Sequence, residues 1–130
     1  MTARDASCGS GALTAHVEGD PVRISVCHCL DCKRRTGSAF SWNATFPAAE
    51  VKVEGEYKTF ERGSDDGYWG RHHFCPTCGV AVFYEIERRP GMISIPVGVF
   101  SDPDFPPPTI EVYVERRCPW LSRLAPEEQR

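Results

Sequence analysis

Seven cysteines are the residues in this sequence best suited to chemistry, and six of them fall in three short segments. The first segment is rich in glycine, the second packs three thiols into six residues, and the third is a Cys-x-x-Cys pair. These six residues are Cys8, Cys27, Cys29, Cys32, Cys75 and Cys78. Thiolates are soft ligands, which favour tetrahedral zinc over magnesium or calcium. The spacing therefore predicts that the chain binds zinc.

The way in which these cysteines divide between metal ions determines what they can do. Four ligands close a structural zinc site, whereas three ligands leave a reactive position open. In one arrangement a single zinc ribbon is formed by Cys29, Cys32, Cys75 and Cys78. In the other, the three thiols at 27–32 hold one zinc with an open position, and the later pair joins Cys8 on a second zinc. The spacing is compatible with both arrangements.

The segment 27–32 has to bend if its three thiols are to meet at one metal ion. In a flat strand the side chains of Cys27 and Cys29 would lie on the same side, roughly 6.5–7 Å apart. Two sulfur ligands of one tetrahedral zinc lie only about 3.8 Å apart. We therefore expect the backbone to curl, with a tight turn at 30–31 that brings Cys32 to the same point. His28 should then face away from the sulfurs and support or pack against the site.

Length and charge limit the classes of protein to which the chain can belong. Its 130 residues suffice for one domain, which we place at 6–121 with loose termini at 1–5 and 125–130. A net charge of −3 argues against a general nucleic-acid binder. The sequence has neither an apolar run of about 18 residues for a membrane nor a signal peptide. We expect a cytoplasmic protein with no nucleic-acid or membrane partner, whose cysteines bind metal rather than form disulfides.

Short β-forming runs separated by turns predict an all-β domain, and 11 glycines with 11 prolines provide many turn positions. One short helical turn is expected at 33–36, and a loop at 63–67. The proline-rich segment 102–108 cannot form regular structure. The predicted strands are 11–17, 22–26, 39–46, 51–53, 57–61, 68–74, 80–86, 92–100 and 110–114.

Five motifs follow one another along nearly the whole chain, from about residue 6 to residue 121. They are Cys8-x-x-Gly11, Cys27-His28-Cys29-x-x-Cys32-Lys33-Arg34-x-Thr36-Gly37, Phe74-Cys75-x-x-Cys78-Gly79, Val97-Gly98-x-Phe100-x-Asp102-Pro103 and Pro119-Trp120. In this order they resemble the glutathione-dependent formaldehyde-activating enzyme family, to which the centromere protein V domain is related. The resemblance implies a zinc-binding β-tent, a mainly β fold built of several short antiparallel sheets.

The resemblance also implies an activity and a division of the cysteines. The activity is the joining of glutathione and formaldehyde to S-hydroxymethylglutathione, as in a carbon–sulfur lyase of the S-(hydroxymethyl)glutathione synthase type. The catalytic zinc of the family corresponds to Cys27, Cys29 and Cys32. Its structural zinc corresponds to Cys8 and the pair at 75–78, but Ser10 stands where the family has a further cysteine. A neutral hydroxyl is a poorer zinc ligand than a thiolate.

The replacement at Ser10 leaves the fourth ligand of the structural zinc open. The candidates are His72, His73 and Cys118, or a water molecule. Neutral imidazole is a good zinc ligand. Alternatively, each histidine is a surface or supporting residue, and Cys118 is a plain thiol.

A basic run, Lys33 to Arg35, follows the second cysteine segment and could bind the carboxylates of an anionic thiol such as glutathione. Arg71 and the histidines at 72–73 could extend this rim. A three-cysteine zinc site suits such a substrate, because a thiol bound at its open position is deprotonated. The alternative function is a non-catalytic binding module with purely structural zinc. A redox enzyme would need a nucleophilic cysteine outside the metal sites, and only Cys118 remains for that role.

Overall fold

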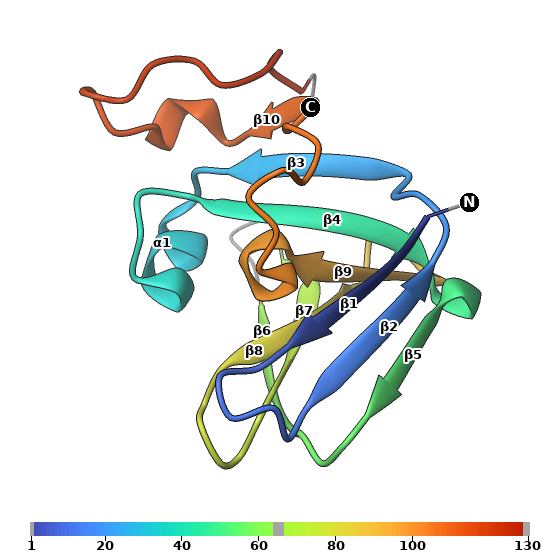
Figure 1. Cartoon of the computed structure of the whole chain (residues 1–130). Coiled ribbons are helices and arrows are strands. Elements are labelled where there is room, and N and C mark those ends of the chain that lie inside the picture. Colours follow the sequence, from blue (N-terminus) through green and yellow to red (C-terminus); the bar gives the residue numbers. More distant parts are fainter. Residues whose placement is uncertain (1, 64–66, 129–130) are drawn as a thin grey trace.

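The computed structural model describes residues 2–63 and 67–128, which form two β-sheets (Figure 1). The smaller sheet is antiparallel and consists of β1 (Ala3–Ser7), β2 (Thr14–Glu18) and β5 (Val51–Glu54), in that order. The larger sheet has the order β10-β3-β4-β9-β8-β7-β6. Its strands are β3 (Arg23–Cys27), β4 (Ser41–Pro47), β6 (Lys58–Gly63), β7 (Trp69–Phe74), β8 (Ala81–Ile86), β9 (Met92–Pro96) and β10 (Ile110–Val112).

Neighbouring strands of the larger sheet are antiparallel, except that β10 runs parallel to β3. Short helices lie between the strands. They are α1 (Leu30–Thr36) and the 3₁₀ helices η1 (Ala48–Glu50), η2 (Val97–Phe100) and η3 (Val114–Arg116). The prediction of a mainly β protein built from small sheets is confirmed.

The hydrophobic core is shared by the two sheets. On the smaller sheet, β2 buries the alternate residues Ala15 and Val17. On the larger sheet, Phe46 of β4 and Ile95 of β9 are fully buried and belong to the same apolar cluster. Complete burial of a side chain of that size contributes roughly 1.5–3 kcal/mol. The core therefore fixes how the two sheets lie against each other, and with them the turns that carry the cysteines.

The prediction of one strand over 92–100 is wrong after Pro96, where the chain turns into η2. Proline has no N–H to continue a strand ladder. The burial pattern also changes, because Val97 and Phe100 are both buried and lie one turn apart in a helix of three residues per turn. The alternation of apolar and polar residues continues past Pro96 in the sequence, but the residues after it are buried with the period of a 3₁₀ helix.

The expectation of loose termini is wrong for the described residues at both ends. Residues 3–5 belong to β1, paired with β2. Near the other end, the Glu111 N–H donates to the Pro126 carbonyl and the Glu128 N–H donates to the Glu111 carbonyl, each at 2.8 Å. Both arms therefore complete sheet edges, and such distant pairing leaves no local pattern in the sequence.

The expected helical turn at 33–36 is the second half of α1, which begins at Leu30. Cys29 caps its N-terminus, and Gly37 ends it with φ of 68°, a left-handed conformation that favours glycine. Residues 64–66 of the predicted loop lie outside the described residues. Among the described residues, no helix is long and apolar enough to cross a membrane.

Candidate metal centres and an arginine-lined cavity

The structure gathers the six motif cysteines into two separate groups. The first, which we name the knuckle cluster, is Cys8, Cys75 and Cys78; the second, which we name the cavity cluster, is Cys27, Cys29 and Cys32. Within each group the sulfur atoms lie within 4.8 Å of one another. The single-ribbon arrangement does not match this grouping, because it needs cysteines of both clusters around one point.

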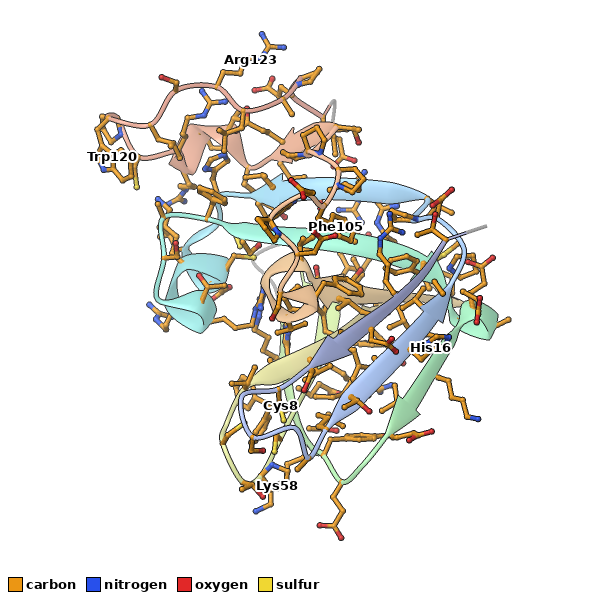
Figure 2. All side chains as sticks on the ribbon, viewed as in Figure 1. Cys8, His16, Lys58, Phe105, Trp120 and Arg123 are labelled. Atoms are coloured by element: carbon orange, nitrogen blue, oxygen red, sulfur yellow. The ribbon has the colours of Figure 1, made fainter. Side chains whose placement is uncertain are left out.

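Two similar turns build the knuckle cluster. In each, the cysteine N–H donates to the carbonyl five residues ahead, from Cys8 to Leu13 and from Cys75 to Val80, both at 3.0 Å. Gly79 closes the second turn with φ of 81°, where a Cβ would be strained. The first turn joins β1 and β2 of the smaller sheet, and the second joins β7 and β8 of the larger one (Figures 1 and 2). The cluster therefore connects the two sheets.

The turns of the knuckle cluster are arranged to hold thiolates. Backbone N–H groups donate to the sulfurs, from Leu13 to Cys8 at 3.2 Å and from Thr77 to Cys75 at 3.3 Å. Hydrogen bonds from Ser10 and Leu13 lower the pKa of Cys8 to about 6, although burial opposes ionisation. The pKa of Cys78 is also lowered, mainly by a backbone hydrogen bond from Val80. Ionised sulfur is the form that binds metal.

Ser10 occupies the remaining corner of the knuckle cluster. Its Oγ lies 3.4 Å from Cys8 Sγ and 3.6 Å from Cys75 Sγ. A tetrahedral zinc with Zn–S bonds of about 2.3 Å and a Zn–O bond of about 2.0 Å would separate sulfur and oxygen by about 3.5 Å. The hydroxyl therefore stands where a fourth ligand would stand.

The other candidates for that fourth ligand lie elsewhere. Both ring nitrogens of His73 are engaged, Nδ1 by the Thr59 hydroxyl at 2.8 Å and Nε2 by Glu85 at 2.7 Å. Cys118 Sγ is 3.4 Å from the ammonium of Lys33, and His72 lines a cavity beside the cavity cluster. Within the described chain none of these side chains joins the knuckle cluster.

The cavity cluster forms where β3 ends and α1 begins. Cys27 is the last residue of β3, and Cys29 is the N-cap of α1, whose sulfur accepts the Cys32 N–H at 3.2 Å. The helix start supplies the curl that the sulfur geometry requires. Cys32 lies in the first turn of the helix, and its sulfur points toward the sulfurs of Cys27 and Cys29.

The three sulfurs of the cavity cluster cannot all ionise without a cation. Donation from Cys27 and Cys29 lowers the pKa of Cys32. The pKa of Cys27 is raised, because it shares its proton with Cys29 and Cys32 and is also buried. A bound divalent cation would remove this conflict, since it stabilises all three thiolates together.

His28 lies between two cavity-cluster cysteines in the sequence, is completely buried, and points toward β10. Its Nε2 lies 2.7 Å from Oε1 of Glu111, which is also completely buried. The second oxygen of Glu111 accepts from Arg117 at 3.0 Å and from the backbone N–H groups of Leu124 and Ala125. Sequence reasoning missed Glu111, although a charged residue inside an apolar strand was a visible sign.

A cavity of about 350 Å³ opens beside the cavity cluster. This volume lies in the range of small-molecule sites. Arginines dominate the charge of its described lining, in which the acidic residues are Asp31 and Glu128. The cationic lining residues are Arg23, Arg35, Arg62, Arg88 and Arg89. The cavity therefore suits an anionic ligand that reaches the three sulfurs.

The predicted basic rim is only partly the one observed. Arg35 lines the cavity, but the Lys33 ammonium binds the carbonyl of Arg116, and the Arg34 side chain is 82% exposed. Arg71 pairs with Glu61 on the surface and does not line the cavity. The other four arginines come from three segments far from the predicted basic run, at residues 23, 62 and 88–89.

Several buried polar atoms around this cavity have no hydrogen-bond partner among the described residues. They are Arg35 Nε, Asn43 Oδ1, Arg62 Nε, and both ring nitrogens of His72. Buried polar groups in folded proteins are nearly always hydrogen-bonded. Their convergence on one cavity indicates a polar ligand.

The fold and the two clusters define a small mainly β protein with two potential thiolate metal centres, one of which faces an arginine-lined cavity. The chain belongs to the family described as glutathione-dependent formaldehyde-activating enzyme, whose model matches residues 3–116. The resemblance seen in the motifs is thus confirmed. None of the curated proteins matches the chain.

Among solved structures, the chain is similar to a crystal structure of a Rhodobacter sphaeroides protein, with 22% sequence identity and a TM-score of 0.60. The similarity covers 79% of this chain and 91% of the other. At this identity the comparison supports the fold.

Proposed function

We propose that the protein is a zinc enzyme that joins an anionic thiol, glutathione or a close analogue, to an aldehyde such as formaldehyde. The product is a hydroxymethyl thiol adduct, and the same site would cleave that adduct in the reverse, lyase direction. Membership of the family supports glutathione-dependent formaldehyde activation, which forms a carbon–sulfur adduct. The finer assignments of metal, ligands and direction are the proposal.

The main support for this proposal is the position of the cavity cluster at the wall of a cavity. Three sulfurs lie together at the wall of a cavity, and no fourth metal-ligating side chain joins them among the described residues. The catalytic ligands would be Cys27, Cys29 and Cys32. Zinc bound there would hold an added thiol as its thiolate at neutral pH.

The arginines of the cavity would bind and orient the substrate. Glutathione carries two carboxylates, and guanidinium groups bind carboxylates in a bidentate manner. Arg23 and Arg89 already bind a carboxylate at the cavity wall, that of Glu128. Arg35 and Arg62 each retain a buried Nε without a partner in the described chain. Arg35 and Arg62 are therefore the arginines that we expect to engage the anionic thiol, because Arg23 and Arg89 already hold Glu128.

A structural zinc would be held in the knuckle cluster by Cys8, Cys75 and Cys78. Ser10 Oγ lies 3.4 Å and 3.6 Å from two of these sulfurs. This is the separation expected between two ligands of one zinc ion, and it supports the hydroxyl as the fourth ligand. This site would join the β1–β2 turn to the β7–β8 turn and so hold the two sheets together. Its role would be stability, with no open position for substrate.

The test is zinc content together with adduct formation. We expect about two zinc ions per chain, and about one in each of the variants Cys27→Ser and Cys78→Ser. Exchange NMR should show faster adduct formation from glutathione and formaldehyde with wild-type protein than with Cys27→Ser. A zinc-loaded protein that neither binds glutathione nor accelerates adduct formation would instead support the non-catalytic binding module.

A further inference from the structure

We propose that His72 is the catalytic residue that hydrogen-bonds the aldehyde oxygen, the atom that becomes the hydroxyl of the thiol adduct. The assignment rests on the proposed function, since it needs a thiol and an aldehyde to meet in the cavity. Among the described residues, His72 belongs to neither sulfur cluster, so neither potential metal centre occupies its ring.

The imidazole of His72 is held in a fixed orientation at the cavity. The residue lies on β7, lines the cavity, and is only 6% exposed. Its cross-strand partner is Tyr84 of β8, whose ring stacks on it at a centroid distance of 5.0 Å and an angle of 30°. The plane of the ring is therefore set before a ligand arrives, as a preorganised donor requires.

Both nitrogens of His72 are buried, and neither has a partner in the part of the chain that the structure describes. Neutral imidazole offers one donor and one acceptor. The next residue, His73, gives the contrast, because Thr59 and Glu85 engage both of its nitrogens. The two adjacent histidines therefore differ in their hydrogen bonds. Protein groups bind both ring nitrogens of His73, whereas those of His72 remain for a ligand in the cavity.

His72 is neutral at physiological pH. Burial, together with the positive charges of Arg35 and Arg62, lowers its pKa to about 4. One ring nitrogen therefore carries a proton and can donate to a carbonyl oxygen without first being charged. Such a fixed neutral donor stabilises the negative charge that develops on oxygen as a nucleophile adds.

The addition balances with thiol and aldehyde alone. A sulfur lone pair forms the S–C bond while the C–O π bond breaks, and the π electrons move to oxygen. The oxygen then takes up the proton that the thiol released, which gives the hemithioacetal. The N–H of His72 would donate to this oxygen throughout, and the same contact would serve the reverse cleavage.

The test compares His72→Phe with His73→Gln. Phenylalanine keeps a ring to stack on Tyr84 and removes both nitrogens. We expect kcat to fall by roughly 10²–10³-fold, as for loss of one oxyanion donor, while zinc content and the KM for glutathione stay unchanged. His72→Gln, which restores an N–H, should recover part of the rate. His73→Gln should leave kcat unchanged.

A second readout is independent of turnover. In protein labelled with ¹⁵N in its histidine rings, glutathione plus formaldehyde should shift the ring signals of His72 but not those of His73. The shift should exceed the one that glutathione alone causes. An unchanged kcat in His72→Phe, or a ring that does not respond to formaldehyde, overturns the assignment and leaves the proposed function intact. Wild-type protein that binds zinc but forms no adduct overturns the proposed function, and this assignment with it.

Discussion

The knuckle cluster and the cavity cluster each contain three cysteine sulfurs, but their surroundings differ. In the knuckle cluster the fourth corner is taken by Ser10, whose oxygen is 3.4 Å from Cys8 Sγ. In the cavity cluster no described histidine, cysteine, aspartate or glutamate takes that corner, and a space of about 350 Å³ lies beside it. The residue at the fourth corner, rather than the cysteine spacing, therefore separates a closed centre from an open one.

The origin of the ligands differs in the same way. The knuckle cluster draws on turns from both sheets, so a metal there contributes to folding. The cavity cluster comes from one continuous segment, the end of β3 and the start of α1. A metal there closes no long loop, and its geometry depends instead on supporting contacts such as that of His28 with Glu111.

The largest expected effect is that of Cys75→Ser, which removes a ligand that connects the two sheets. We expect the free energy of unfolding to fall by roughly 4 kcal/mol or more, since structural zinc binding contributes directly to folding. Thermal unfolding followed by circular dichroism, with zinc content measured in parallel, tests this. Cys118→Ser is the matched control and should leave both quantities unchanged. Equal stability of Cys75→Ser and wild type would contradict a structural role for the knuckle cluster.

Cys29→Ser should separate activity from stability. Serine is a good N-cap, so α1 keeps an acceptor for the Cys32 N–H while the metal loses a thiolate. We expect kcat/KM for adduct formation to fall by more than about 100-fold, beyond the loss typical of supporting residues. The melting temperature should fall less than in Cys75→Ser. A Cys29→Ser protein with wild-type activity would refute the catalytic assignment of the cavity cluster.

Glu111→Gln should weaken the support of the cavity cluster. The amide cannot accept from His28, Arg117 and the backbone of the C-terminal segment as the carboxylate does. Loss of this buried acceptor should cost about 1–3 kcal/mol of unfolding free energy. Chemical denaturation measures it, with Glu127→Gln as an exposed control. A loss no greater than that of the control would show that the buried pair does not anchor this segment.

Ser10→Cys should sharpen the comparison by closing the knuckle cluster with a fourth thiolate. We expect transfer of its zinc to a chelator to slow by about tenfold or more, because thiolate binds zinc better than hydroxyl. Ser10→Ala should speed the transfer. Adduct formation should be the same in wild type and Ser10→Cys. Identical zinc transfer in all three proteins would remove Ser10 from the ligand set.

The last expected effect concerns pH. The pKa of His72 in the folded protein is about 4, below its value near 6.5 in an unfolded chain. Below pH 6.5 the unfolded chain binds a proton that the folded protein does not, so this stability is present at neutral pH and lost as pH falls toward 4. At pH 5 the loss is roughly 2 kcal/mol. Unfolding at pH 7 and pH 5 should show a smaller drop for His72→Phe than for wild type, and an equal drop would contradict this pKa.

Features encoded over a few residues could be predicted from the sequence. The cysteine spacing indicated metal ligands, and the alternating segments placed most strands within a few residues. Cys29 as a helix N-cap was missed, because the same residue was interpreted only as a ligand before a turn. The strand predicted over 92–100 failed at Pro96, where burial changes its period.

What could not be predicted depends on contacts between distant segments. Arg62 and Arg23 reach the cavity from different strands, and Glu128 reaches it from the C-terminal segment. The approach of Ser10 to Cys75 joins residues 65 positions apart. His72 and His73 are identical in type and adjacent in sequence, so only the fold distinguishes the satisfied ring from the open one.

The central claim is that the cavity cluster admits an external thiol and the knuckle cluster does not. Titration of the cobalt-substituted protein with glutathione tests it most directly, since each new cobalt–thiolate bond adds charge-transfer absorption. We predict an increase equivalent to one added thiolate per chain, lost in Cys29→Ser and retained in Ser10→Cys. Absence of any increase in wild type, or an equal increase in Cys29→Ser, would contradict the account.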